Sequence, residues 1–329
     1  MEQQYEVKQE TRNTIQRVEK AIKAYLASCK ANGLSAGTIA NYERITKKYM
    51  DYIKENGYDE ANVASVNDWK ISLAEDGVKI TTMNLYLSVL HSFFAWAEQM
   101  KMIDNSPVIP VVMPSKKAVN MEKKKAYKHL LEEEDFRRIL NGGKPKGVPE
   151  MKWKRNKAIL VMLMTTALRN SELRDLRMRD LNFEEGTVKV EKGKGNKERL
   201  AAFPKVTQDV VKEYLESGYR PNNLGQDDFV FGTNEDGNWN QFDRFTLSQL
   251  VERNIRLATG KDGYRSHSCR HFAATQYFDK GVDLQSISEV LGHSNLQTSQ
   301  IYIEKLRPAL SSQKASMAFD SFNARGADR

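Results

Sequence analysis

Apolar residues in the first third of the chain recur at three- and four-residue steps, the spacing that puts them on one face of an α-helix. Gly33 and Gly57 interrupt this pattern and Pro107 closes it, while Ser35 stands where it can cap the second helix. We therefore predict a compact unit of four helices over residues 14–112. In order, these helices cover 15–29, 35–53, the surroundings of Trp69 and Leu73, and the stretch from Thr81 or Thr82 to 97.

Helical and strand-like patterns alternate beyond residue 128. The apolar run over 158–168 is too short to cross a bilayer, which needs about 20 residues, so it predicts a buried helix. Residues 187–191 and 198–203 alternate like two strands around a glycine-rich turn. The prediction is a mainly α protein, with a helical N-terminal domain and a mixed α/β domain that is mostly helical and holds a small antiparallel sheet. The other predicted elements are helices at 130–140, 152–166 and 171–176, a strand at 228–231, and helices from Phe242 onward with breaks at Gly260–Gly263, Gly281 and Gly292–Asn295.

The charge of the chain points to a polyanionic partner. Among 329 residues, 51 are Lys or Arg and 43 are Asp or Glu, which leaves a net charge of +8. Nucleic acid is the first candidate and an anionic membrane surface the second, although an ordinary basic cytosolic protein would have the same charge. Cys29 and Cys269 lie far apart, so we predict neither a disulfide framework nor a zinc site. The polar N-terminus is no signal peptide, and a cytoplasmic protein is expected.

Residues 113–127 are predicted to form a basic linker between the two units. The stretch lacks apolar periodicity, and Pro107, Pro110 and Pro114 punctuate the chain just before it and within it, so we expect it to be extended and exposed. A lysine run is usually a solvated face, but between two domains of a basic protein it is also suited to phosphate contacts. Its lysines are Lys116, Lys117, Lys123, Lys124 and Lys125.

Groups able to act on a phosphodiester cluster late in the chain. His267 and Arg270 lie three residues apart, so on a helix they share one face, and a guanidinium beside an imidazole can clamp a phosphate. Further on come His293, in a predicted turn, and Tyr302, nine residues later. Each has an ordinary structural interpretation as well: a hydrogen-bonding pair, a turn residue and a core tyrosine.

Two more candidates lie upstream. Lys194 stands between glycines in the turn that joins the two predicted strands, where it can reach outward; it is otherwise an exposed hairpin tip. The segment lacks the spacing of a phosphate-binding P-loop. Arg169 directly follows the buried helix, so it is partly desolvated and needs an anion. Glu172 could supply that anion for a purely structural reason.

Together these segments resemble the tyrosine recombinases, also called the phage integrase family, and the hairpin resembles its Xer-type members. The resemblance covers 128–305, and the N-terminal unit resembles the family's core-binding, SAM-like domain. Ala167 stands where many members have glycine and Cys269 where leucine is usual; both are apolar packing positions. The matching segments are Thr-Ala-Leu-Arg-Asn-Ser-Glu-Leu at 166–173, Gly-Lys-Gly-Asn-Lys-Glu-Arg at 193–199, His-Ser-Cys-Arg-His at 267–271, and Leu-Gly-His at 291–293 followed by Tyr302.

The resemblance implies a site-specific DNA recombinase that integrates, excises or resolves DNA elements without ATP, cofactor or metal. Tyr302 would attack the scissile phosphorus, form a 3′-phosphotyrosyl bond and free a 5′-hydroxyl. Lys194 would protonate that leaving oxygen, and His267 would assist proton transfer at the tyrosine. The remaining roles are transition-state stabilisation by Arg169, Arg270 and His293, and orientation of Arg169 or His267 by Glu172.

The resemblance also implies the partners. We expect double-stranded DNA with specific core sites, contacted by the linker lysines together with Lys197 and Arg199, and accessory DNA-bending proteins. The protein would be a monomer or dimer off DNA and a homotetramer in the synapse, where the tail, 306–329, would dock on a neighbouring protomer. The short stretch before residue 14 leaves no room for an arm-binding domain, which favours a simple core-site recombinase. The setting would be a prokaryotic cytoplasm, at the nucleoid, with the gene carried by a chromosome, a phage or a mobile element.

Three alternative functions predict different features in the sequence. A type IB topoisomerase uses the same chemistry as a monomer, but the Xer-like hairpin and the separate helical unit argue against it. A non-catalytic DNA-binding regulator would not need all six candidate catalytic residues. A metabolic enzyme would leave the +8 charge and the basic linker unexplained.

Overall fold

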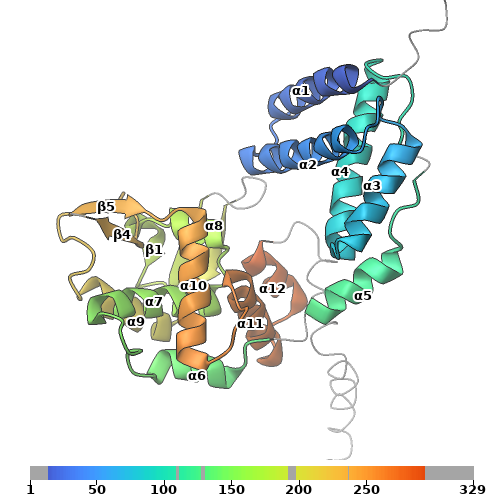
Figure 1. The fold of residues 1–329 in the computed structure, drawn as a ribbon. Helices are drawn as coiled ribbons and strands as arrows, with labels where there is room; N and C mark the ends of the chain where they lie inside the picture. Colours follow the sequence, from blue (N-terminus) through green and yellow to red (C-terminus); the bar gives the residue numbers. More distant parts are fainter. Residues whose placement is uncertain (1–13, 109–110, 127–129, 192–197, 236, 293–329) are drawn as a thin grey trace, which may run out of the picture. The chain divides into compact units, whose positions relative to one another are not determined.

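The computed structural model describes residues 14–108, 111–126, 130–191, 198–235 and 237–292, and for residues 122–126 it describes the backbone only. The chain divides into two compact units, Met1–Ala126 and Tyr127–Arg329 (Figure 1). Within the described residues, no helix is long and apolar enough to cross a membrane.

The first unit is helical, and the four helices predicted for it are confirmed. α4 is its central element and contacts each of the others. Tyr49, Leu87, Phe93 and Phe94 are fully buried in its core, where Tyr49 packs on Trp69 with ring centroids 5.3 Å apart. Burial of such large side chains supplies most of the favourable free energy of folding. The helices are α1 (Ile15–Ala31), α2 (Ala36–Glu55), α3 (Val63–Glu75), α4 (Ile80–Gln99) and α5 (Lys116–Ala126).

Local sequence explains where these helices begin. The Ser35 hydroxyl accepts a hydrogen bond from the Thr38 amide at 3.2 Å, so the predicted cap of α2 is confirmed. Asn62 and Ser65 cap the start of α3 reciprocally, each side chain accepting from the other's backbone amide. These bonds satisfy amide donors that the first turn of a helix leaves without partners.

The prediction of an extended linker is wrong, because the basic stretch forms the helix α5. The Ser115 hydroxyl accepts from the Ala118 amide at 3.1 Å and begins the helix, and Val119 is buried. Lysine and alanine are good helix formers, and the last proline, Pro114, precedes the helix. A stretch so rich in lysine leaves too weak an apolar period to reveal a helix from the sequence.

The second unit combines helices with two small antiparallel sheets (Figure 1). α7 is its core helix: residues 158–164 are fully buried, which confirms the prediction, and α6, α9, α10 and α11 all contact it. β1, β2 and β3 pair in that order, with Val188 opposite Ala201. The helices are α6 (Glu133–Asn141), α7 (Glu150–Thr166), α8 (Asn170–Asp175), α9 (Lys205–Leu215), α10 (Arg244–Thr259), α11 (Ser266–Asp279) and α12 (Leu284–Leu291). The strands are β1 (Leu181–Asn182), β2 (Thr187–Val190), β3 (Arg199–Ala202), β4 (Gly232–Glu235) and β5 (Asn238–Gln241).

The prediction of a strand at 228–231 is wrong, because the next strand, β4, begins at Gly232. Only Phe229 makes a bridge there, to Arg177, and the next residues form the hairpin β4–β5 instead. Val230 and Phe231 are apolar because they are buried in the core. Gly232 permits the hairpin, since a Cβ there would come within 2.5 Å of the Asn240 carbonyl oxygen.

Candidate functional site

The site forms where the end of α7 and the short helix α8 meet the C-terminal end of α12. α7 ends at Ala167, which has a φ of 55° in the left-handed region. An L-residue there costs roughly 1 kcal/mol, which glycine avoids. Position 167, predicted for apolar packing, is therefore also constrained by its backbone conformation. Its carbonyl faces Arg270, whose Nη1 donates to it at 2.6 Å.

Arg169 is held from two sides. As the first residue before α8, it donates from its backbone amide to Glu172 Oε2 at 2.8 Å and from Nη1 to Oε1 at 2.6 Å. Its Nη2 donates to the Leu291 carbonyl at 3.1 Å and to the Gly292 carbonyl at 2.8 Å. A quarter of the side chain, 24%, remains exposed. The guanidinium is thus fixed in direction while part of it faces solvent.

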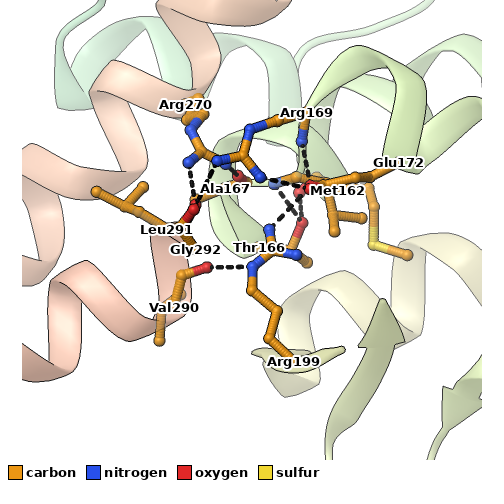
Figure 2. A network of polar contacts seen from close by, with 11 residues as sticks. Met162, Thr166, Ala167, Arg169, Glu172, Arg199, Arg270, Val290, Leu291 and Gly292 are labelled. Carbon is orange, nitrogen blue, oxygen red and sulfur yellow. Dashed lines mark hydrogen bonds and ion pairs between the residues drawn. The ribbon is translucent and has the colours of Figure 1, made fainter. Parts of the chain in front are cut away.

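Arg270, on α11, reaches the same place from the opposite side (Figure 2). It is 3% exposed, and its Nη2 also donates to the Leu291 carbonyl. One main-chain oxygen therefore accepts from both arginines, which places the two guanidinium groups side by side. The C-terminal end of a helix carries partial negative charge, so the end of α12 favours both cations.

Glu172 offsets part of the positive charge of Arg169, Arg199 and Arg270. Its side chain is 2% exposed and accepts from Arg169 and, at 2.8 Å, from the Arg199 Nη2. Burial by itself would raise the pKa of Glu172, but the charge of Arg199 and the hydrogen bonds and charge of Arg169 outweigh it, so the pKa lies below its usual value. Of the two partners expected for Glu172, the structure shows Arg169.

His267 lies in the first turn of α11, with its ring edge-on to His271 at a centroid distance of 4.3 Å. Part of the side chain remains exposed. Partial burial, followed by the charges of Arg270 and Arg169, lowers the pKa of His267 from its ordinary value. The ring is therefore neutral near pH 7 and can accept a proton.

A titration of the DNA-free protein should show this shift. We expect the His267 ring to titrate with a midpoint below the ordinary value of about 6.5, because partial burial and the two nearby arginines both disfavour the protonated ring. Since the unfolded chain then binds the proton more tightly, His267 should stabilise the fold fully above about pH 6.5 and less as the pH falls. NMR titration of the ring protons, assigned with His267→Gln, measures the midpoint. A midpoint at or above 6.5 would contradict the described environment.

Cys269 lies between His267 and Arg270 in the sequence and is fully buried. Burial raises the pKa of its thiol to about 12. The thiol stays protonated and inaccessible. The packing role expected for this position therefore fits the structure, and the buried thiol should not react with thiol reagents in the folded protein.

The structure brings together Arg169, Glu172, His267 and Arg270, and adds Arg199, which we had expected on the DNA-contacting surface. The main-chain carbonyls of Ala167, Val290, Leu291 and Gly292, to which arginines donate, could not be found from the sequence, because every residue type carries a carbonyl. Lys116 and Lys117 are exposed on α5. Lys194, Lys197, His293 and Tyr302 lie outside the described residues, as do the side chains of Lys123, Lys124 and Lys125.

Comparison with known proteins agrees with this arrangement. Residues 129–307 match the phage integrase family, and residues 11–101 match the N-terminal SAM-like domain of phage integrases. The tyrosine recombinase XerC of Bacillus pumilus is 30% identical over 286 residues, which cover 84% of this chain and 88% of that protein. XerC of Lactobacillus delbrueckii subsp. bulgaricus is 30% identical over 242 residues, covering 72% and 77%.

A solved structure shares the fold. The XerH site-specific recombinase, bound to a palindromic difH substrate after cleavage, superposes with a TM-score of 0.67 at 22% identity over 92% of this chain and 84% of that one. The family match over residues 129–307 and the XerC relatives show that the chain belongs to the phage integrase family, the tyrosine recombinases, and is a tyrosine site-specific recombinase.

Proposed function

We propose that this chain cleaves and rejoins double-stranded DNA at specific core sites through a 3′-phosphotyrosyl bond to Tyr302. One observation carries the proposal: Arg169 and Arg270, 101 residues apart in sequence (270 − 169), donate to the same oxygen atom, that of Leu291. Two guanidinium groups that converge on one oxygen can also grip the oxygens of one phosphate. A guanidinium has five N–H donors, more than the three bonds that the Arg169 side chain makes to the residues that the structure describes.

The proposed reaction proceeds by two displacements at phosphorus. The Tyr302 oxygen forms a bond to phosphorus while the bond to the 5′-oxygen breaks, and the phosphotyrosine retains the bond energy for rejoining. His267, whose pKa is lowered by partial burial and by the charges of Arg270 and Arg169, takes the tyrosine proton, and Lys194 gives a proton to the leaving oxygen. Arg169 and Arg270, with His293, stabilise the charge that grows on the non-bridging oxygens.

Trapping the covalent intermediate tests this function. On nicked DNA that carries the termini of its own element, the protein should form a complex that resists denaturant and should release a 5′-hydroxyl, without ATP. If the wild type forms no such complex on any candidate terminus, the proposal fails. Relaxation of plasmids that lack a recombination site would instead favour the topoisomerase reading.

Lysines and assembly complete the proposal. Lys116, Lys117, Lys123, Lys124, Lys125 and Lys197 would contact phosphates and give binding that weakens with salt. The protein would act at the nucleoid in the cytoplasm, as a monomer or dimer off DNA and as a tetramer in the synapse, with accessory DNA-bending proteins.

The C-terminal tail offers a test of the assembly. A chain truncated after Arg307 keeps every proposed catalytic residue, so it should retain part of its cleavage activity. It should lose tetrameric complexes on DNA, because the tail would no longer dock on a neighbouring protomer. Native gels of the DNA complexes and the cleavage assay measure the two effects. Tetramers that persist on DNA after truncation would contradict the docking role.

A further inference from the structure

Arg199 begins β3 and lies inside the site. Its side chain is 9% exposed. The Nη2 donates to Glu172 Oε2 at 2.8 Å, and the Nε donates to the Val290 carbonyl at 2.9 Å. Its Cδ and Nε also lie against Gly292, where a Cβ would meet them at 3.0 Å. The guanidinium therefore bridges α8, β3 and the end of α12 (Figure 2).

Placing a guanidinium here is costly. Burial lowers the pKa of Arg199 from its usual value; Glu172 opposes this shift, while the nearby charge of Arg169 adds to it. Within the described residues, its Nη1 is buried and has no hydrogen-bond partner. Buried ion pairs of this kind add little net stability compared with apolar residues of similar size. A role in arranging the site accounts for the residue better than a role in holding the fold together.

The contacts of Arg199 indicate that it positions Glu172 and the C-terminal end of α12. Glu172 accepts from Arg199 with the same Oε2 that accepts from the Arg169 backbone amide, so both arginines fix one carboxylate. Val290 lies one residue before Leu291, the carbonyl on which Arg169 and Arg270 converge. Arg199 also follows Lys194 by five residues along the chain (199 − 194).

We propose that Arg199 is a positioning residue, which fixes Glu172 and the C-terminal end of α12 so that Arg169 is aimed at the scissile phosphate. This inference rests on the proposed cleavage chemistry. It replaces the expectation that Arg199 contacts DNA. The alternative is that its Nη1 binds a DNA phosphate directly, and the two roles differ in what they do to binding and to cleavage.

Two measurements on Arg199→Met separate these roles. A positioning residue should leave the DNA dissociation constant and its salt dependence unchanged, while single-turnover cleavage falls about 10- to 100-fold, because small misplacements of catalytic groups slow reactions by such factors. A phosphate contact should instead weaken binding and reduce the slope of log K against log salt by about one. That second result would overturn the proposal, and so would cleavage at the wild-type rate.

A double-mutant cycle with Glu172→Gln adds a readout that a general loss of stability would not give. If Arg199 acts through Glu172, the double variant should cleave no more slowly than the slower single variant. If the rate losses of the two single variants multiply in the double variant, Arg199 does not act through Glu172. Arg199→Lys serves if Arg199→Met does not fold, since it keeps the charge but loses the fork; a Lys variant that cleaves like the wild type would equally refute the role.

The matched control is Arg137→Met on α6, an arginine whose side chain is 65% exposed and which pairs across one turn with Glu133. Its cleavage rate should equal that of the wild type. Formation of the wild-type covalent complex on the same DNA tests the cleavage chemistry separately. If the wild type cleaves and Arg199→Met cleaves equally fast, only the positioning role is lost.

Discussion

Tyr302→Phe should bind its DNA site as tightly as the wild type and form no covalent complex. The substitution keeps the ring and removes the one oxygen that would bond to phosphorus. Removing the nucleophile in covalent catalysis costs factors of about 10⁴ to 10⁶, which puts cleavage below detection in a gel assay. Denaturing gels of labelled, nicked DNA measure the complex, and filter binding or gel shift measures affinity.

Tyr277→Phe is the matched control for that experiment. Tyr277 lies on α11, donates its hydroxyl to the Thr165 carbonyl, and burial raises its pKa to about 12, so it is a poor nucleophile. This variant should still form the covalent complex. If Tyr302→Phe formed the complex and Tyr277→Phe did not, the nucleophile would be misassigned; a complex in both would point to a residue outside the proposed site.

Arg270→Lys should slow cleavage by a factor of about 100 to 1,000, the usual cost of removing one preorganised donor from a developing oxyanion. Lysine keeps the positive charge but offers a single point instead of a fork. It cannot donate to the Ala167 and Leu291 carbonyls together and still face a phosphate, as the two Nη groups of Arg270 allow. Single-turnover cleavage at saturating protein isolates this effect from DNA affinity.

The same variant should also be less stable. A buried carbonyl that loses its donor costs about 1–3 kcal/mol, so the midpoint of thermal unfolding should fall, and the cleavage assay must be run well below it. Arg256→Lys on α10, whose side chain is 58% exposed, is the control and should change neither quantity. A cleavage rate of Arg270→Lys within a few-fold of the wild-type rate would show that Arg270 only holds the Ala167 and Leu291 carbonyls and does not stabilise the phosphate.

Strong local signals predicted most of the fold. The apolar period, the cap at Ser35 and the closing proline located the helices of the first unit, because each signal acts within a few residues of the backbone it controls. Weak signals misled. Val119 of α5 is buried in a stretch rich in lysine, and the apolar pair Val230 and Phe231 enters the core without forming a strand. In both places tertiary packing, not local preference, decides the conformation.

The candidate site divides in the same way. Spacing and resemblance selected Arg169, Glu172, His267 and Arg270, and the structure brings these four together. The roles proposed for Lys194, His293 and Tyr302 stay predictions, since they lie outside the described residues. Arg199 was expected to contact DNA, and the structure buries its side chain against Glu172. A sequence shows that an arginine is present and not whether its guanidinium turns inward.

The amino-acid sequence alone determined most of the helices, the family resemblance and the side chains able to act on a phosphodiester. These properties depend on residue identity and short-range spacing, both of which the sequence contains. Only the tertiary structure decided that Arg169 and Arg270 converge on the Leu291 carbonyl and that Glu172 joins Arg169 to Arg199. The physical reason is that the acceptors are main-chain oxygens and a buried carboxylate, brought to the arginines by packing between segments as far as 123 residues apart.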